Sequence, residues 1–370
     1  MALRLENVSR TVQGECYLDG INIAFERGSF NVLLGRTLAG KTSLMRVMAG
    51  LDQPNTGKIY MDEVDVTGVP VQKRKISMVY QQFINYPNLS VFENIASPLR
   101  IEGLSHADVK DKVESVAAML HIEDYLQRMP LELSGGQQQR TAMARALVKD
   151  SQLILFDEPL VNLDYKLREE LRFELRELFK KQNTIAIYAS TEPSEALALG
   201  GTTTLMHEGR IIQSGPVNDV YSKPEQVTAA ELFSEPPINI ISGQLSDRTV
   251  TFDTGISFGL SQSGELQDGD YQFGLRPHHL SMSPLAEDAV SMELQVDVAE
   301  ISGSETFLHL ATQRAGDGRT INLVAQITGV HSFHTDVSVP VYFSPADLYV
   351  FDQAGETVLL PHGATQGRAA

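Results

Sequence analysis

One segment, Gly-Arg-Thr-Leu-Ala-Gly-Lys-Thr at residues 35–42, constrains the fold of this chain more than any other. An apolar strand-like run, Phe30–Leu34, leads into it, and residues 41–49 follow with apolar side chains at helical spacing. A glycine-bearing loop in this place gathers backbone N–H groups into a nest, and the helix N-terminus adds positive potential. The sequence therefore predicts a phosphate-binding strand–loop–helix unit, with a plain glycine turn before a helix as the alternative.

The side chains of this loop suit the phosphates of ATP and a magnesium ion. Lys41 places a point charge between the β- and γ-phosphates, and the Thr42 hydroxyl is a ligand for Mg²⁺. We expect ATP to contact Gly35, Arg36, Thr37, Ala39, Gly40, Lys41, Thr42 and Ser43.

A second candidate site follows the apolar run Leu153–Phe156, which is typical of a parallel strand buried on both faces. The strand delivers Asp157 to the sheet edge, where its carboxylate can hold the magnesium shell. Glu158 comes next and can polarise a water for attack on the γ-phosphate. In isolation an Asp-Glu pair is more often a solvated turn, but behind a phosphate loop we favour the catalytic interpretation.

A third segment, Leu-Ser-Gly-Gly-Gln at residues 133–137, precedes a predicted helix over 138–149. A serine hydroxyl and glycine amides at a helix N-terminus form an anion-binding surface that can meet a γ-phosphate. We therefore expect Ser134, Gly135, Gly136 and Gln137 to bind nucleotide. The alternative is an ordinary Ser-Gly-Gly helix cap.

Composition limits the remaining possibilities. The chain has 370 residues, enough for two domains, and its formal net charge of −17 argues against nucleic acid as a partner. A single cysteine, Cys16, excludes an internal disulfide framework. No run approaches the roughly 18 apolar residues of a membrane-spanning helix, and the first residues alternate like a strand rather than a signal peptide. Any membrane association is therefore expected to come through a protein partner.

The character of the sequence changes near Glu235-Pro236-Pro237. Before this point strands alternate with helices, which predicts an α/β ATP-binding domain over 1–236 with a helical subdomain at about 88–134. After it come short strands and turns without a long helix, which predicts a β-rich domain over 238–355 and a tail at 356–370. The strands that we expect in the second domain are 271–275, 292–298, 306–310, 321–326 and 338–343.

The order of these motifs, with Tyr80-Gln81 and the Asn-Leu-Asp of residues 162–164, resembles an ABC transporter nucleotide-binding subunit. The resemblance covers residues 1–235 almost end to end. Within that family, residues 86–94 and 274–280 are similar to the importer ATPases for maltose, glycerol-3-phosphate and glycerol, which carry a C-terminal β-rich (OB- or TOBE-like) regulatory domain. Residues 79–98 and the Thr-Leu-Ala centre of the phosphate loop look closest to bacterial glycerol importer ATPases, which have two different cassette subunits.

The resemblance implies a head-to-tail dimer in which each ATP lies between the phosphate loop of one subunit and the Leu-Ser-Gly-Gly-Gln segment of the other. It implies that Gln81 contacts the magnesium ion or attacking water, and that Asp164 crosses the dimer interface. An exposed strand end is the alternative for Gln81. A groove around residues 81–88 would receive a helix of the membrane subunit.

The partners implied are integral membrane permease subunits, a second ABC ATPase subunit (identical or different) and, indirectly, a periplasmic substrate-binding protein. The implied place is the cytoplasmic face of the inner membrane. The transported substrate is glycerol or a related polyol, sugar or sugar phosphate by resemblance alone.

The chain departs from the family at two positions. Thr191 stands where the family carries a histidine that orients the attacking water, and loss of one such group typically costs about 10²–10³ in rate. We therefore predict slow hydrolysis at this chain's own site and a non-identical partner with an intact histidine. Val12 stands where an aromatic residue usually stacks on adenine, so Tyr17 is a candidate for that stack or merely a strand-surface tyrosine.

Two other classes stay open. A non-transport ABC ATPase is disfavoured because neither tandem cassettes nor a coiled-coil insertion is visible. A catalytically weak regulatory or structural nucleotide-binding subunit is supported by Thr191 but opposed by the retained Lys41 and Glu158.

Overall fold

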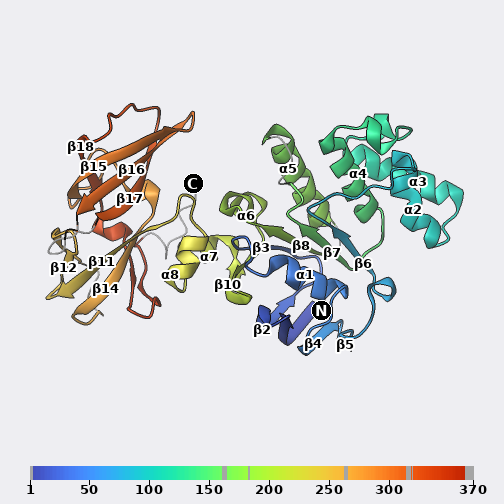
Figure 1. Ribbon diagram of the computed structural model, residues 1–370, viewed down its shortest axis with the longest axis horizontal. Helices are drawn as coiled ribbons and strands as arrows, with labels where there is room; N and C mark the ends of the chain where they lie inside the picture. The colour runs from blue at the N-terminus through green and yellow to red at the C-terminus, as the bar shows by residue number, and fades with distance from the viewer. Residues whose placement is uncertain are drawn as a thin grey trace. The chain divides into compact units, whose positions relative to one another are not determined.

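The computed structural model describes residues 3–160, 165–181, 184–261, 266–313, 318 and 320–362. These residues divide into two compact units, Met1–Val217 and Asn218–Ala370 (Figure 1). Within the described residues the α/β cassette and the β-rich second unit are both present, as the sequence predicts.

A mostly parallel six-stranded sheet forms the centre of the first unit, in the order β10-β9-β3-β8-β7-β6. Its strands are β3 (Phe30–Leu34), β6 (Ile76–Val79), β7 (Leu153–Asp157), β8 (Ile185–Ser190), β9 (Thr202–His207) and β10 (Arg210–Pro216). Strands β6, β7, β8, β3 and β9 pair in parallel, so their carboxyl ends meet at one edge. Ligands of open α/β sheets bind outside this edge, which places the site.

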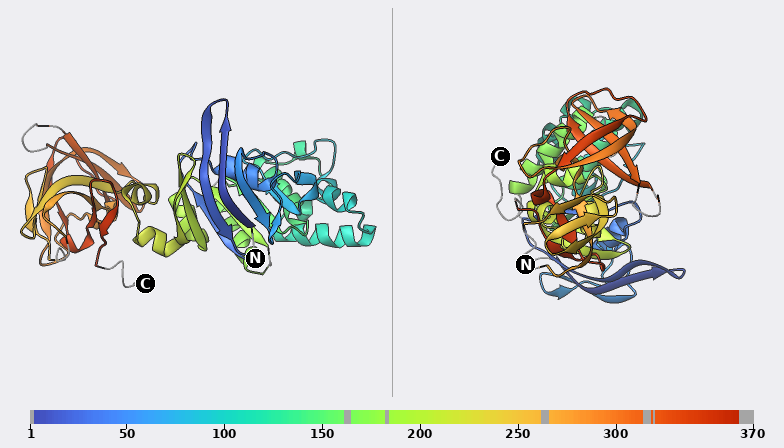
Figure 2. Two further views of the ribbon diagram at one scale, coloured as in Figure 1. Left: turned by 90° about the horizontal axis from the view of Figure 1, so that it is seen from below. Right: turned by 90° about the vertical axis from the view of Figure 1, so that its left-hand side faces the viewer.

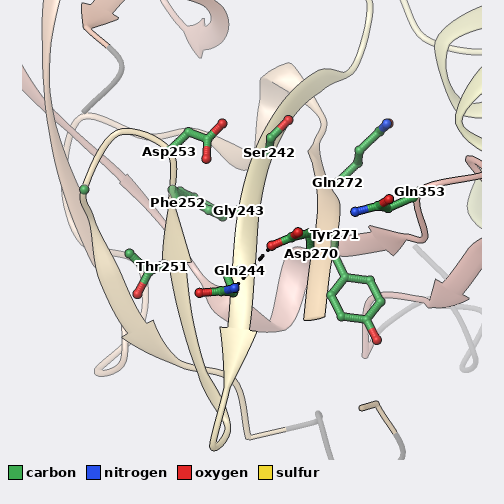
Figure 3. A pocket seen from close by; sticks show the side chains of 11 residues that line it. Ser242, Gly243, Gln244, Thr251, Phe252, Asp253, Asp270, Tyr271, Gln272 and Gln353 are labelled. Atoms are coloured by element: carbon green, nitrogen blue, oxygen red, sulfur yellow. Dashed lines mark hydrogen bonds between the residues drawn. The ribbon is translucent and has the colours of Figure 1, made fainter. Parts of the chain in front are cut away.

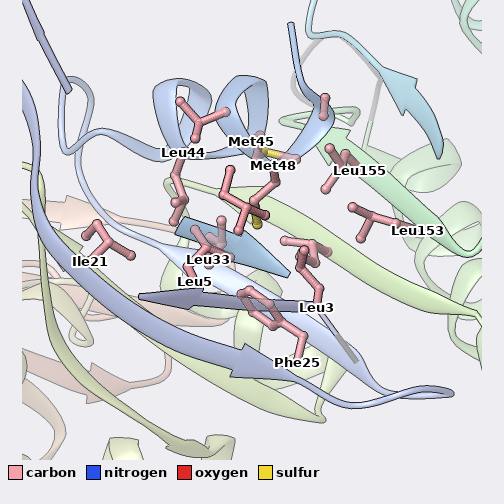
Figure 4. Packing of buried hydrophobic residues seen from close by; sticks show 14 of the residues in the cluster. Leu3, Leu5, Ile21, Phe25, Leu33, Leu44, Met45, Met48, Leu153 and Leu155 are labelled. Atoms are coloured by element: carbon pink, nitrogen blue, oxygen red, sulfur yellow. The ribbon is translucent and has the colours of Figure 1, made fainter. Parts of the chain in front are cut away.

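An antiparallel sheet in the order β2-β1-β4-β5 packs with helix α1 (Lys41–Ala49) around one hydrophobic core. Its strands are β1 (Leu3–Val12), β2 (Glu15–Phe25), β4 (Thr56–Met61) and β5 (Val64–Asp65). Figure 4 shows Leu3, Leu5 and Phe25 of this sheet meeting Leu44 and Met48 of the helix, with Leu153 and Leu155 of β7 beside them. This core holds the loop between β3 and α1 in place.

Helices α2 (Val91–Ile101), α3 (His106–Met119) and α4 (Gly135–Leu147) form the helical part, and α5 (Tyr165–Lys181) and α6 (Pro193–Leu199) flank β8 (Figure 1). Ser90 and Ser105 cap α2 and α3 by accepting backbone hydrogen bonds from Glu93 and Asp108. Helix α4 begins at Gly135 rather than at the predicted residue 138, because the Ser134 side chain caps it there.

The second unit contains two antiparallel sheets, β13-β12-β11-β14-β19-β20 and β17-β16-β15-β18, that share one hydrophobic core (Figure 2). The strands of the first sheet are β11 (Asn239–Ser246), β12 (Thr249–Phe252), β13 (Ser257–Gly259), β14 (Gly269–Leu275), β19 (Tyr349–Phe351) and β20 (Thr357–Leu359). Those of the second are β15 (Val290–Ile301), β16 (Glu305–Gln313), β17 (Thr320–Thr328) and β18 (Ser338–Phe343). All of the strands predicted for this region are present, and most extend further than predicted.

The division between the units lies earlier than the predicted boundary at 236–238. Two short helices, α7 (Val217–Ser222) and α8 (Val227–Leu232), belong largely to the second unit. Arg276, 1% exposed, fixes this segment by donating to the carbonyl oxygens of Tyr221 and Phe233. The predicted tail is also shorter than expected, since residues 357–359 form β20 and pair with β19.

Candidate functional site

The loop between β3 and α1 has the glycine geometry that a phosphate nest requires. A Cβ atom added at Gly35 would lie 2.4 Å from the carbonyl oxygen of Met206. Gly40 adopts φ +101, and a Cβ there would lie 2.8 Å from the Tyr17 carbonyl oxygen. Both positions therefore exclude any other residue, and α1 begins at the next residue, Lys41.

Lys41 is buried, at 4% exposure, with its ammonium group inside the loop. Its Nζ donates to the carbonyl oxygens of Gly35 and Arg36 at 2.8 and 3.2 Å and lies 3.2 Å from Oε1 of Glu158. The loop thus holds a positive charge over the nest of backbone N–H groups, where an anion would be stabilised.

Asp157 ends strand β7 beside this loop. Its Oδ1 accepts a hydrogen bond from the Thr42 hydroxyl at 3.0 Å, although α1 and β7 are far apart in sequence. Burial raises the pKa of the Asp157 carboxyl, with the Thr42 hydrogen bond acting in the opposite direction and Glu158 adding to the rise. Burial of this carboxylate is costly even though the positive charges of Lys41 and Arg46 act to lower its pKa, which fits a site that takes up a metal ion.

Glu158 follows with φ +47, a left-handed backbone that non-glycine residues rarely adopt. Its two carboxylate oxygens face Lys41 and the Gln81 amide, whose Nε2 donates at 3.3 Å. The residue is therefore held between the phosphate loop and the segment after β6, where it can reach a water beside a bound phosphate.

Lys41, Gln81 and Glu158 border one hollow of about 420 Å³ on the first unit, and Asp157 lies behind it, hydrogen-bonded to the lining residue Thr42. Its lining residues are Glu15, Cys16, Tyr17, Thr37, Leu38, Ala39, Gly40, Lys41, Thr42, Ser43, Gln81 and Glu158. Most of the residues predicted from the phosphate loop are thus brought together. Gly35 and Arg36 do not border the hollow, and each contributes a carbonyl oxygen that Lys41 contacts.

The Leu-Ser-Gly-Gly-Gln segment lies apart from that hollow. Ser134 accepts from the Gln137 backbone N–H at 3.4 Å, while the Gln137 side chain accepts from the Ser134 N–H at 2.9 Å, which is a capping box. A Cβ added at Gly135 would meet nothing within 4 Å, so this helix N-terminus is open to solvent. None of the residues 134–137 borders the hollow of its own chain.

Comparison with known proteins decides the family. The family model described as "ABC transporter" matches residues 18–161. The sn-glycerol-3-phosphate import ATP-binding protein of Pectobacterium atrosepticum is 31% identical over 95% of this chain and 97% of its own. The protein of the same name from Paraburkholderia xenovorans is 35% identical over 83% of this chain and 87% of its own.

The chain belongs to the ABC transporter family of ATP-binding proteins. It is accordingly an ATP-binding enzyme of the ATP hydrolase class. Two solved structures support the fold: a bacterial ABC transporter cassette in dimeric form is 26% identical with a TM-score of 0.54, covering 58% of this chain and 98% of that one. The same cassette in a post-hydrolysis dimeric state bound to ADP and phosphate gives a TM-score of 0.53.

The donor atoms of this ABC ATPase suit Mg²⁺. Across the described residues no group of three or more His, Cys, Asp and Glu side chains could hold a metal ion unaided. Thr42, Asp157 and Gln81 offer a hydroxyl, a carboxylate and an amide oxygen around one hollow, which are hard oxygen ligands of the kind that Mg²⁺ prefers when it shares its shell with phosphate.

Thr191 directly follows β8, whose last residue, Ser190, pairs with Leu34 at the start of the phosphate loop. The side chain is half-buried and does not border the hollow. Two side-chain hydrogen bonds hold the residues on either side of Thr191 in place. Ser190 Oγ donates to Glu195 at 2.5 Å, and Arg168 donates to Glu192 at 2.9 Å. Thr191 therefore lies at the edge where the parallel strands end, but its side chain does not border the hollow.

Asp164, which the resemblance places at the dimer interface, lies outside the described residues. Tyr17 is 39% exposed at the rim of the hollow, with its hydroxyl donating to Glu15 at 3.3 Å. Sequence reasoning missed Glu15, Cys16 and Leu38 as lining residues. Proximity to Tyr17 could have indicated the first two, but the outward position of Leu38 depends on loop backbone angles that the sequence does not reveal.

A larger hollow of about 690 Å³ lies on the second unit, over the solvent faces of β11, β12 and β14. Figure 3 shows Ser242, Gln244 and Asp270 on this face, with Gln244 donating to Asp270. It is an open polar sheet surface rather than a site with convergent charges.

Among the described helices, none is long and apolar enough to cross a membrane.

Proposed function

We propose that this chain is the ATP-hydrolysing subunit of an importer for glycerol-3-phosphate or a related polyol, sugar or sugar phosphate. The observation that carries the proposal is one hollow bordered by Lys41, Thr42, Gln81 and Glu158, with Asp157 hydrogen-bonded to Thr42 behind it. The chain is also at least 31% identical over most of its length to curated sn-glycerol-3-phosphate import ATP-binding proteins. ATP binding and hydrolysis follow from the family, whereas the proposed substrate comes from the names of the relatives.

Each residue has a role in this proposal. The backbone amides of residues 37–42 and the Lys41 ammonium bind the phosphates, with Arg36 and Ser43 completing the loop. Thr42, Asp157 and Gln81 would hold Mg²⁺, which would supply positive charge against the transferred phosphoryl group. Phosphate draws Lys41 away from Glu158, and the freed carboxylate orients the attacking water. Tyr17 stacks on adenine at the rim.

We further propose that two cassettes bind head to tail. Ser134, Gly135, Gly136 and Gln137 form an open anion-binding helix N-terminus that the chain's own hollow does not use. A second cassette would supply the γ-phosphate that this surface lacks, and Asp164 would lie near the same interface. The solved relatives are dimeric by their titles, which supports this arrangement.

The permease would contact the segment after Gln81. Ile84 and Tyr86 are 63% and 49% exposed, an apolar surface that suits a helix from integral membrane subunits on the cytoplasmic face of the inner membrane. Arg145 donates to the Ile84 carbonyl oxygen at 2.6 Å, and Asn85 donates to that of Gln138 at 2.8 Å. The segment is thus tied to α4, whose N-terminus is the anion-binding surface, so movement at the permease would reach the partner's ATP. A periplasmic binding protein would act through the permease alone.

A second candidate function is a nucleotide-binding subunit with weak turnover, favoured by Thr191. A threonine hydroxyl is shorter than imidazole and carries no positive charge, so ATP at this chain's own hollow would be cleaved about 10²–10³-fold more slowly than at a site with histidine. The β-rich unit would serve regulation in either case.

The test is transport-coupled ATP hydrolysis by the complex isolated from native membranes through a tag on this chain and rebuilt into liposomes. Binding proteins from the same cells are added with glycerol-3-phosphate, glycerol or maltose. Stimulation by glycerol-3-phosphate supports the narrow proposal, and stimulation by glycerol alone supports the broader polyol class. If no membrane subunit co-purifies with the tagged chain, the transporter proposal is wrong.

A further inference from the structure

Leu38, in the middle of the phosphate loop, combines two properties that rarely occur together. Its backbone adopts φ +69, in the left-handed region. Its side chain is 92% exposed, more than any other exposed large apolar side chain among the described residues. A leucine in this conformation is strained because its Cβ crowds the backbone, and glycine would relieve the strain.

No contact among the described residues explains this choice. At Gly40, two residues on, neighbouring backbone requires glycine, whereas the Leu38 side chain at 92% exposure gains almost no packing within its own chain. The residue thus keeps both backbone strain and exposed apolar surface at the edge of the ATP hollow, which it helps to line. Strain of this kind persists at positions where it serves function.

The second cassette provides what the chain itself lacks. In the proposed dimer, which this inference takes as given, the phosphate loop faces the helix N-terminus of α4 in the other subunit. In this chain that surface has open space at Gly135, and the exposed apolar side chains of Leu131 and Met129 precede it, at 86% and 36% exposure. A cassette that presents a face like this one would offer apolar surface next to its anion-binding glycines.

We propose that Leu38 is an apolar anchor that the signature-bearing face of a second cassette covers when ATP closes the dimer. Closure of the dimer would bury the Leu38 side chain, which is exposed in the single chain. This burial should tighten ATP-dependent association by about 10- to 100-fold. The residue contributes to association and to the choice of partner rather than to phosphate binding, which the loop backbone performs.

The experiment places a photo-reactive phenylalanine derivative at position 38 of the full chain in native membranes, with the same group at Arg248 as the control. Arg248 also has positive φ (62) and is exposed, but it lies in the β-rich unit. The expected result is an ATP-dependent adduct from position 38 to residues around the Leu-Ser-Gly-Gly-Gln segment of a cassette subunit, identical or different, and none from position 248.

The outcomes separate this inference from the proposed function. Recovery of a second cassette with adducts elsewhere, or with none, overturns the role of Leu38 and leaves the transporter proposal standing. Absence of any second cassette copy overturns both.

A substitution gives the second readout. Leu38→Gly removes the strain, so the thermal stability of the nucleotide-free chain should be equal or higher. ATP-dependent association with the second cassette should weaken about 10- to 100-fold. Arg248→Gly relieves the same kind of strain and should leave association unchanged. ATP-dependent association that is undiminished in the Leu38→Gly chain at saturating ATP would contradict the proposal.

Discussion

The two anion-binding surfaces of the first unit differ in how they are built. The phosphate loop is closed: Lys41 is buried, and its ammonium contacts two carbonyl oxygens and Glu158 before any ligand arrives. The N-terminus of α4 is open: Gly135 has empty space where a side chain would be, and none of residues 134–137 borders the hollow of its own chain. A closed site holds its ligand alone, whereas an open one needs a second body to complete it.

The contrast extends to chemistry. The phosphate-loop side retains Asp157, Glu158 and Gln81 but has Thr191 at the position where orientation of the water is expected. The α4 side retains its serine and both glycines. With the roles that we propose, the chain would complete another subunit's ATP site better than it would hydrolyse ATP at its own.

The largest effect is expected from Lys41→Ala. Loss of the ammonium removes a charge-assisted contact to the phosphates, and ATP affinity of the isolated chain should fall about 10²-fold. Equilibrium binding of a fluorescent ATP analogue measures this. Lys58→Ala, at an exposed lysine of β4, is the matched control and should bind normally. Unchanged affinity in the Lys41 variant would show that the hollow is not the nucleotide site.

Gly135→Asp tests the open surface. The new side chain has room, so the chain should fold and bind ATP normally, but its charge would repel the γ-phosphate presented by the second cassette. Turnover of the membrane complex should fall about 10²–10³-fold. Gly68→Asp, at another uncrowded glycine, is the control. A variant with full turnover would mean that α4 does not meet nucleotide.

Thr191→His should raise cleavage at this chain's own site. Imidazole is long enough to reach the phosphate and can carry charge, so single-turnover cleavage should increase about 10²-fold with the other cassette's phosphate loop disabled. Thr191→Ser keeps the hydroxyl and should change nothing. If the histidine variant is no faster, Thr191 is not the missing group.

The smallest effect concerns stability. The pKa of Asp157 is raised by burial above the ordinary value of 3.8, so its carboxyl group binds a proton more tightly in the folded chain than in the unfolded chain. This contribution to stability is present at low pH and is lost as pH rises from the unfolded value through the raised one. Asp157→Asn should therefore stabilise the nucleotide-free chain at neutral pH, and the gain should vanish below the unfolded pKa. Melting temperatures across pH measure it, and a constant difference at all pH values would contradict the assignment.

Much of the site was predictable because it depends on local patterns. The strand–glycine–helix arrangement predicted α1 over residues 41–49, and the apolar run Leu153–Phe156 predicted a buried strand ending at Asp157. Repeated apolar spacing and glycine positions determine such elements within a few residues.

Other features were not predictable from the sequence because they depend on tertiary contacts. The start of α4 depends on a capping box between Ser134 and Gln137, and the unit boundary depends on buried Arg276, which holds α7 and α8 against the β-rich unit. The strain at Leu38 is a backbone property that a leucine in a glycine-rich loop does not reveal.

The most direct test of the contrast between the closed and open surfaces is rapid-quench cleavage of radiolabelled ATP by the complex isolated from native membranes. With ATP bound at both sites, we predict two phases of equal amplitude whose rates differ about 10²-fold, the slow phase belonging to the phosphate loop of this chain. A single phase that consumes all of the bound ATP would show that the Thr191 site turns over as fast as its counterpart, and would contradict the account.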